Sequence, residues 1–443
     1  MRKTPFAIFL LAIVIVAFIG GGIVVLNEVF PTRFLYQANL AGHSLFKQKT
    51  KYSKFRTDLW EKARTKEKGV VVYDQGKAYS GYTLYSSADR QSVYLIDMHG
   101  RVVHTWHMDY SSFWDKHAAV KHPVPATNMF ITKAYLYPNG DLLAVYVGVG
   151  NTPWGAGMVK MDGQSKLIWK YMAYTHHDVD VAPDGDIYVL TQAIVHTPIK
   201  RFTQLKPPWI EDYVVILSPQ GKVKQKIALT PALLHSPWGR SFAELPWFSV
   251  VGAGDYLHTN AVQYVDAEEA KYFPRVRAGD VLVSFREMNM IAILDPRQKK
   301  IVWALRGSWI GQHDPVVLPD GDILMFDNNG HFGPGGRSRD IEINPKTGAI
   351  VWSYTGDKQH FFQSIIRGGQ QRLPNGNTLI TEEQAGTLLE VTPDDQVVWK
   401  FVNPVRGGPD NADIPVVSVA TRIKPSWLDP AFRREVKQQE DKQ

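Results

Sequence analysis

The sequence predicts an all-β fold, a β-propeller, and three repeated features indicate it. From Gly69 onward, short runs of β-branched and aromatic residues alternate with turn residues, a pattern typical of strands. The turn Pro-Asp-Gly-Asp recurs at 183–186 and 319–322. The strand pattern Ile-Val-Trp recurs at 301–303 and 350–352. These features mark a repeat of about 45 residues with four strands, which is the size of one propeller blade.

The first thirty residues predict a transmembrane helix. Arg2 and Lys3 precede an apolar run whose core, 6–26, contains no polar side chain, and about 20 such residues cross a bilayer. Because the basic residues come first, the positive-inside rule predicts a single-pass protein of the bacterial inner (cytoplasmic) membrane. The N-terminus then lies inside and the remainder in the periplasm or an equivalent outer space. A cleaved signal peptide is the alternative, but the run is long for one and Gly20–Gly22 lies inside it.

The chain divides into four parts by composition. Residues 1–30 are the predicted anchor and 31–68 a short helical stalk or linker rich in Lys, Arg and Glu. Residues 69–425 are the predicted propeller, and 426–443 form a charged C-terminal tail.

Composition also excludes several classes of function. The chain of 443 residues has no cysteine, which excludes thiolate catalysis, cysteine metal sites, disulfides and a lipoprotein anchor. Its net charge is +7, but the basic residues are scattered and no nucleic-acid motif is present, so we expect no nucleic-acid partner. No dinucleotide fingerprint or zinc-protease motif occurs, and no cofactor is predicted. The sequence identifies no protein partner.

The repeat is clearest at 313–356. There we expect strands at 313–318, 323–326, 340–344 and 350–354, joined by turns. Five units of this kind can be aligned along the chain.

The two ends of the predicted propeller combine into one further unit. Residues 70–106 supply its first strands and 416–423 complete it, which covers sheet edges that would otherwise be open. We therefore predict six four-stranded blades. A seventh blade requires strands within 225–257.

Three histidines occupy similar places in these repeats. His177 and His313 each stand six residues before the proline of a Pro-Asp-Gly-Asp turn. His258 opens a similar stretch that is interrupted by an insertion at 265–278. Because equal phase in stacked repeats becomes equal height in space, we expect the three imidazoles to meet at one mouth of the central channel. His176 is the neighbour of His177, and strand alternation lets only one of the two face the channel; the spacing favours His177.

The ends of the second strands reach the same mouth. They carry Arg286, the segment 326–330 and the segment 381–383. The glycine-rich stretch 328–339 lacks the ending of a phosphate loop, and we interpret it as a mouth loop that brings its basic side chains over a ligand. The predicted ligand-binding residues at this mouth are Asn260, Asn328, Arg337 and Arg339.

Each of these residues also has a structural interpretation. Repeats keep histidines to bond a neighbouring blade, but the corresponding places in two other units hold Thr132 and Gly368, which favours function. Arg286 has Glu287 beside it, as in a structural ion pair. The Pro-Asp-Gly-Asp turns and the tryptophans are interpreted as architecture rather than as calcium sites.

Four short segments resemble the bacterial arylsulfotransferases (aryl-sulfate sulfotransferases). They are Leu-His-Thr-Asn-Ala at 257–261, Ser-Phe-Arg at 284–286, Gly-Gln-His-Asp-Pro at 311–315 and Phe-Asp-Asn-Asn-Gly at 326–330. The resemblance covers roughly 70–425. It implies a six-bladed propeller that moves a sulfuryl group from an aryl sulfate ester to a phenol without a nucleotide cofactor (PAPS-independent). This chain departs from the familiar enzymes in lacking their extra N-terminal β domain and cysteine pair.

The resemblance also implies residue roles. His313 matches the histidine that becomes transiently sulfated, His258 and Arg286 match its partners in the active site, and His177 matches a fourth member. Arg286 with His258 would hold the anionic oxygens. A second histidine, His258 or His177, would protonate the leaving phenolate and later deprotonate the acceptor. A covalent intermediate predicts ping-pong kinetics.

Two alternatives remain open at the level of sequence. One is a non-catalytic, membrane-tethered propeller that acts as a scaffold or a ligand-binding module, since a fold does not determine function. The other is a metal site ligated by the three histidines. The positive charge of Arg286 disfavours it, because that charge would repel a metal ion.

Overall fold

The computed structural model of the chain describes residues 3–26, 58–202, 205, 207–245, 254–329, 336–357 and 360–442. The chain forms two compact units, 1–56 and 57–443. The first contains the helix α1 (Lys3–Leu26). Taken over the described ranges, no helix combines the length and the apolar character that a membrane span requires. A transmembrane helix, as predicted for residues 1–30, is not found in these ranges.

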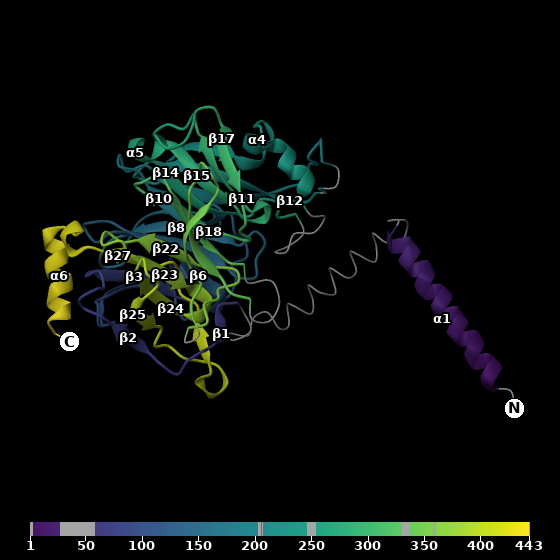
Figure 1. Ribbon diagram of the computed structural model, residues 1–443, viewed down its shortest axis with the longest axis horizontal. Coiled ribbons are helices and arrows are strands. Elements are labelled where there is room, and N and C mark those ends of the chain that lie inside the picture. The colour runs from purple at the N-terminus through teal and green to yellow at the C-terminus, as the bar shows by residue number, and fades with distance from the viewer. Residues whose placement is uncertain are drawn as a thin grey trace. The chain divides into compact units, whose positions relative to one another are not determined.

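Four blades of the second unit are built from consecutive antiparallel strands (Figure 1). The first is β6 (Met129–Leu136), β7 (Leu142–Gly148), β8 (Gly155–Met161) and β9 (Leu167–Tyr171), and the next is β10 (Thr175–Val181), β11 (Ile187–Val195), β12 (Trp209–Leu217) and β13 (Val223–Ala228). The third is β14 (Thr259–Val265), β15 (Asp280–Phe285), β16 (Met290–Asp295) and β17 (Lys300–Arg306), and the fourth is β18 (His313–Val317), β19 (Ile323–Asp327), β20 (Arg339–Ile343) and β21 (Ile350–Tyr354).

The last two blades combine strands from both ends of the unit. One is β27 (Thr421–Ile423), β3 (Tyr82–Ser87), β4 (Ser92–Ile96) and β5 (Val102–His107). The other has five strands, β22 (Gly369–Arg372), β23 (Thr378–Glu382), β24 (Thr387–Val391), β25 (Val397–Val402) and, outermost, β2 (Gly69–Tyr73). The prediction of six blades closed by C-terminal residues is confirmed. The prediction that 70–106 belongs to a single blade is wrong, because β2 pairs with β25 in the neighbouring blade.

Short helices connect and cover the blades. They are α3 (Tyr110–Phe113), α4 (Leu229–Leu234), α5 (Ala267–Ala270) and α6 (Pro430–Glu440), with the 3₁₀ turns η1 (Ala126–Asn128), η2 (Gly239–Glu244), η3 (Arg286–Met288), η4 (Glu383–Ala385), η5 (Pro409–Asn411) and η6 (Pro425–Trp427). Where it is described, the stretch 225–257 contains the end of β13, α4 and η2 and adds no seventh blade.

The predicted helical stalk is only partly described, since 31–57 lies outside the described residues. In the remainder, 58–68, the chain forms the strand β1 (Trp60–Lys62), which pairs with β26 (Asp413–Pro415). The helix prediction is wrong for this part. Leu59 and Trp60 are buried against the propeller, so tertiary packing outweighs the helix-favouring charged composition.

The repeated tryptophans join neighbouring blades. The indole N–H of Trp106 donates to Gly140 O (3.0 Å), that of Trp169 to Pro219 O (3.1 Å) and that of Trp352 to Pro393 O (3.1 Å). Each acceptor belongs to a turn of the next blade. The architectural interpretation of these tryptophans is therefore confirmed, and the inter-blade bond explains why they recur at one place in the repeat.

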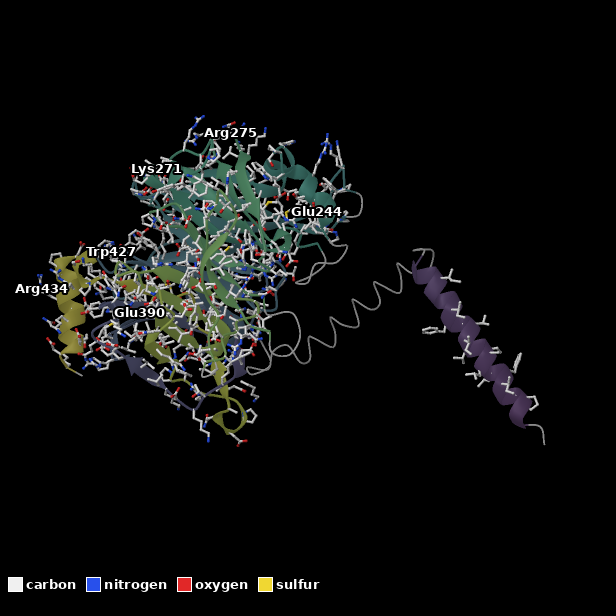
Figure 2. All side chains as sticks on the ribbon, viewed as in Figure 1. Glu244, Lys271, Arg275, Glu390, Trp427 and Arg434 are labelled. Atoms are coloured by element: carbon white, nitrogen blue, oxygen red, sulfur yellow. The ribbon has the colours of Figure 1, made fainter. Side chains whose placement is uncertain are left out.

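The C-terminal segment is more ordered than a charged tail. Within it, α6 packs on the rim of the propeller through Phe432 and Val436, which are buried, while Arg434 points outward (Figure 2). The Phe432 ring lies 5.9 Å from that of Trp106. The amphipathic spacing of two apolar residues among charged ones suffices for this docking.

Candidate functional site

The first strands of three blades begin with an irregular backbone. Register shifts interrupt the pairing of β10 between His176 and Val179, of β14 after Thr259 and of β18 after His313. His177 has φ of 54° and His258 has φ of 47°, both in the left-handed region that non-glycine residues seldom adopt. Strain of this kind is retained mainly at functional sites.

These irregular segments bring three imidazoles together. The ring centroid of His177 lies 5.1 Å from that of His258 and 6.5 Å from that of His313. The predicted convergence of the three histidines is therefore present in the structure. His258 and His313 are buried, and His177 is half-buried.

Equal phase in the repeats explains why His177 and His313 meet, but it does not explain the position of His258. The residues that pair with the first position after each Gly-Asp turn are Val181, Tyr264 and Val317. His177 and His313 stand four residues before this position, but His258 stands six residues before it. Asn260 has the phase of the other two histidines. His258 reaches the cluster from the loop before β14, where its left-handed backbone redirects the side chain.

His313 is held in one tautomer by an amide. Its Nδ1 lies 2.5 Å from Asn328 Oδ1 and 3.0 Å from Gly311 O, and both atoms only accept hydrogen bonds. The Asn328 amide is itself oriented, because its Nδ2 donates to Ser364 O (2.7 Å) and Arg367 O (2.9 Å). The proton of His313 therefore resides on Nδ1, and Nε2 carries the lone pair.

Burial and nearby positive charge keep this imidazole neutral. Burial, followed by the charge of Arg286, lowers the pKa of His313 well below its ordinary value. Among the described residues, the buried Nε2 of His313 has no hydrogen-bond partner. A neutral imidazole with an unoccupied Nε2 lone pair is a nucleophile.

His258 is held by a carboxylate instead. Its Nδ1 lies 2.5 Å from Asp255 Oδ2, in a pair that is buried on both sides. Burial and the neighbouring Arg286 lower the pKa of His258 to about 3. Asp255 was missed in the sequence, although an acidic residue three positions before a candidate histidine is a recognisable signal.

His177 is bonded to the histidine beside it. The two Nδ1 atoms of His176 and His177 lie 2.7 Å apart. His177 faces His258 and His313, as the spacing favours, and His176 contacts it from behind. The register shift after His176 allows the two neighbouring side chains to touch. Trp154 completes this part of the site: its ring stacks on His258 at 5.0 Å and meets His177 edge-on at 5.8 Å. No sequence pattern marked Trp154.

Arg286 lies beside the histidines at the end of β15. Its backbone N–H donates to His258 O (3.3 Å), and its guanidinium forms a buried ion pair with Glu287. The structural interpretation of Arg286 as a partner of Glu287 is therefore correct. Its charge nevertheless acts on His258 and His313, as their lowered pKa values show.

The four predicted ligand-binding residues have other contacts. Asn260 Nδ2 donates to Gln312 O (2.7 Å), and Asn328 holds His313. Arg337 donates to Thr355 O (3.2 Å) and Asp357 O (3.1 Å), and Arg339 is bound to Asp327 Oδ2 (2.6 Å).

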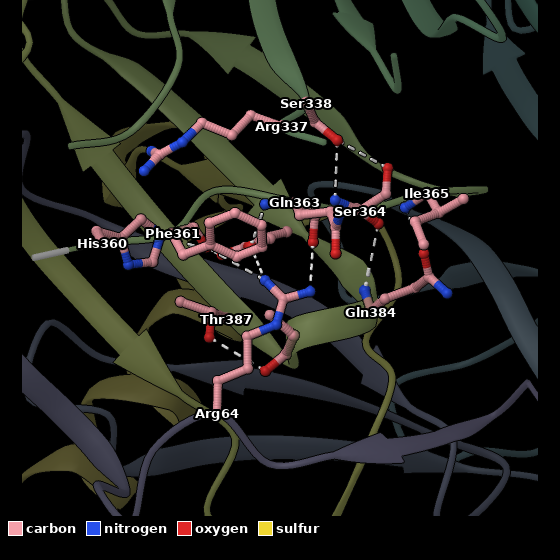
Figure 3. A network of polar contacts seen from close by, with 12 residues as sticks. Arg64, Arg337, Ser338, His360, Phe361, Gln363, Ser364, Ile365, Gln384 and Thr387 are labelled. Atoms are coloured by element: carbon pink, nitrogen blue, oxygen red, sulfur yellow. Dashed lines mark hydrogen bonds and ion pairs between the residues drawn. The ribbon is translucent and has the colours of Figure 1, made fainter. Parts of the chain in front are cut away.

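Arg337 belongs to a separate polar network at the blade ends. The Phe361 ring lies between the guanidinium groups of Arg337 (5.2 Å) and Arg64 (5.7 Å) (Figure 3). Among the described residues, the hydrogen bonds of Arg337 and Arg339 go to these groups and not to the histidine cluster. The centre of the predicted mouth loop, 330–335, lies outside the described residues.

A second guanidinium, half-buried, was missed in the sequence. Arg367 donates to Asp58 O and Asp58 Oδ2, both at 2.9 Å, and its charge contributes to lowering the pKa of His177 after burial and the neighbouring histidines. The positive charges of Arg286 and Arg367 thus both act on the histidines, which suits an anionic ligand. Within the described ranges, no group of three or more His, Asp or Glu side chains is arranged to hold a metal ion.

Comparison with known protein families finds that one family model matches the chain. The family model described as arylsulfotransferase (ASST) matches residues 133–404, which include the three histidines and Arg286. No curated protein is similar to the chain.

Solved structures resemble the chain only weakly. A protein of unknown function from Bacteroides caccae is 13% identical, with 77% of this chain and 98% of that chain covered and a TM-score of 0.49. A streptogramin B lyase is 11% identical (80% and 88% covered, TM-score 0.39). The virginiamycin B lyase of Staphylococcus aureus is 9% identical (79% and 98% covered, TM-score 0.37). Likeness at this level carries no argument about function.

Proposed function

The chain belongs to the arylsulfotransferase family, and from this premise we propose that it transfers a sulfuryl group from an aryl sulfate ester to a phenolic acceptor, without a nucleotide cofactor. The observation that carries the proposal is the state of His313. Its Nδ1 is held by Asn328 and Gly311, and its Nε2 lone pair is unoccupied among the described residues. A scaffold has no need of a histidine prepared in this way.

In the first step, the Nε2 lone pair of His313 attacks the sulfur atom. The bond between sulfur and the phenolic oxygen breaks, and the oxygen leaves with the electron pair as phenolate. The product is an N-sulfohistidine. The lowered pKa of His313 supports this step because only a neutral imidazole has a lone pair to donate.

Positive charge stabilises the transferring group. Like a phosphoryl group, it carries negative charge on its three equatorial oxygens. We expect Arg286, together with His258, to hold these oxygens. Each fixed donor of this kind contributes about 3–4 kcal/mol. A second histidine, His258 or His177, protonates the leaving phenolate and takes the proton of the acceptor phenol.

The experiment uses the purified full-length protein with a chromogenic aryl sulfate and a phenol. His313→Ala should abolish both the transfer and the burst of released phenol. His258→Ala and Arg286→Ala should slow transfer by about a hundredfold or more each. With labelled aryl sulfate and an alkaline quench, the label should appear on the peptide that contains His313. The control is His196→Ala, which alters an exposed histidine and should leave the rate unchanged.

Three outcomes would count against the proposal. Label on another peptide would reassign the nucleophile. Full activity of His313→Ala would remove the mechanism. Neither label nor transfer with any phenol would favour a non-catalytic scaffold or ligand-binding propeller.

We also propose a location outside the cytoplasm for the propeller. Its support is the order of Arg2 and Lys3 before the apolar run. External protease should then degrade the C-terminal part of the protein in intact spheroplasts. Protection of that part, or a mature N-terminus that begins after Gly22, would contradict a retained anchor.

A further inference from the structure

We propose that His176 and Asp212 form a buried relay behind His177 and thereby make His177 the residue that exchanges the proton with the phenol oxygens. The proposal rests on the proposed function. His176 and Asp212 are positioning residues, since they act through His177. In the sequence, His176 was considered only as the alternative to His177, and Asp212 was not considered. The three residues come from two strands, β10 and β12.

The first link of the relay joins the two histidines. Their Nδ1 atoms are 2.7 Å apart, and their rings meet at 80° with centroids separated by 5.0 Å. Two imidazole nitrogens at this distance must share one hydrogen, so one ring donates and the other accepts. Trp154 contacts both rings edge-on, at 6.0 Å from His176 and 5.8 Å from His177, and restricts their orientation.

The second link joins His176 to a carboxylate. His176 Nε2 lies 3.7 Å from Asp212 Oδ1, and both side chains are fully buried. In the described part of the chain, neither of these two atoms has a hydrogen-bond partner. Buried polar atoms seldom remain unpaired, and a shift of less than 1 Å would join this pair. The other carboxylate oxygen, Oδ2, is fixed by the backbone N–H of Thr259 at 2.7 Å.

These links determine the tautomer of His177. Because Asp212 only accepts when ionised, the proton of His176 resides on Nε2, and its Nδ1 accepts from His177 Nδ1. His177 then carries its proton on Nδ1, and its Nε2 is available to the substrate. His258 and His313 have the same tautomer, but Asp255 and Asn328 hold them directly.

The relay explains how His177 can hold a second proton. Burial, then His176, His258, His313 and Arg367, lower the pKa of His177 well below its ordinary value. Alone in these surroundings, the imidazole would not be protonated near neutral pH. A carboxylate reached through His176 supplies the opposite charge and stabilises the imidazolium. Burial, followed by the charge of Asp255, raises the pKa of Asp212 to about 7, so the relay carboxylate is ionised above neutral pH.

The proton balance of both steps is then complete. In the first, the Nε2 proton of the His177 imidazolium passes to the leaving phenolate oxygen as the sulfur–oxygen bond breaks. In the second, the acceptor oxygen attacks sulfur while its proton passes to His177 Nε2. The sulfur–nitrogen bond breaks, and its electron pair returns to His313 Nε2. His177 is suited to this exchange because it is less buried than His258 and His313.

The test compares aryl sulfates whose phenols differ in acidity, using the full-length protein. A nitro-substituted phenolate leaves without a proton, whereas an alkyl-substituted one needs it. Asp212→Asn and His176→Gln should slow transfer from the alkylphenyl sulfate about a hundredfold and from the dinitrophenyl sulfate less than about threefold. The matched control is Glu211→Gln, a buried carboxylate one residue earlier on β12 that accepts from Thr230 N and should slow neither donor.

Equal slowing of both donors by Asp212→Asn and His176→Gln would mean a merely structural role and would overturn the relay. A second measurement does not depend on activity: in ¹⁵N-histidine spectra, Asp212→Asn should shift the Nδ1 signal of His177 and leave that of His313 in place. No shift would also overturn it. If the unaltered protein releases no phenol from any aryl sulfate, the proposed function fails, and the spectra still decide whether the relay exists.

Discussion

At the scale of single residues, Lys133 couples two of the candidate histidines. Its Nζ lies 3.0 Å from Asp178 Oδ1 and 3.1 Å from Asp314 Oδ1. Each of these aspartates directly follows a histidine of the cluster. Burial alone lowers the pKa of Lys133, but the two carboxylates outweigh it and raise the pKa overall. The ion triad therefore ties two irregular strand starts together.

Lys133→Met is expected to destabilise the fold by about 3–5 kcal/mol, because it leaves two buried carboxylates without a counter-charge. Denaturant unfolding followed by tryptophan fluorescence measures the change. Lys62→Met is the control, since the Lys62 side chain is 75% exposed and an exposed pair contributes about 0–1 kcal/mol. Equal losses in the two variants would show that the triad adds nothing.

Glu211 makes stability depend on pH. Burial raises its pKa from 4.5 to about 8 in the folded chain. A carboxyl group with a raised pKa binds its proton more tightly when folded. The contribution of Glu211 to the free energy of unfolding is therefore complete below pH 4.5 and is lost as the pH rises toward 8.

Glu211→Gln removes this titration. The unfolding free energy of the variant relative to the unaltered protein should rise between pH 5 and pH 8, by at most about 1.4 kcal/mol per pH unit. Denaturant titrations at four pH values measure it. A difference that is independent of pH, or that falls, would contradict the assignment.

At the scale of elements, the docking of α6 depends on one aromatic side chain. Phe432 is buried against Trp106 and Gly140, and a Cβ on Gly140 would come within 2.6 Å of the Phe432 ring. Gly140 also has φ of 90°, which favours glycine. The turn between β6 and β7 is thus shaped to accept this ring.

Phe432→Ala should lower the unfolding free energy by about 3 kcal/mol through loss of buried surface, unless the helix detaches at smaller cost. Limited proteolysis distinguishes the two, because a detached helix is cut first. Arg433→Ala, at an exposed position of the same helix, is the control. If Phe432→Ala resists the protease as well as the control does, the Phe432 ring does not hold α6.

At the scale of the whole molecule, strands from both ends of the propeller unit close the ring. The strand β27 pairs with β3, and β2 pairs with β25, so two adjacent blades each combine early and late residues. Each of these two blades therefore needs strands from both ends of the propeller unit. Closure removes sheet edges and links the unfolding of all blades.

A chain that ends at residue 415 lacks β27 and should lose cooperative unfolding, so that fluorescence and circular dichroism report different midpoints. A chain that ends at 425 keeps β27 and lacks η6 and α6. It should retain one transition at a lower midpoint. A single shared transition in the shorter chain would show that β27 is not needed for closure.

Local patterns in the sequence determined the architecture. Turn residues, strand periodicity and a recurring tryptophan predicted six blades, because each depends on neighbours within about 45 residues. The same patterns predicted that His177, His258, His313 and Arg286 meet, and the structure brings them together.

Only the tertiary structure decided how those histidines are held. Asn328 behind His313, Asp255 behind His258 and His176 behind His177 depend on bulges and loops that no repeat pattern encodes. Segments outside the blade then fix these partners, as Ser364 and Arg367 orient Asn328 and the backbone of Thr259 fixes Asp212. The physical reason is that period and turn chemistry are local properties of the chain, whereas the partner and tautomer of a buried imidazole depend on which blades pack around it.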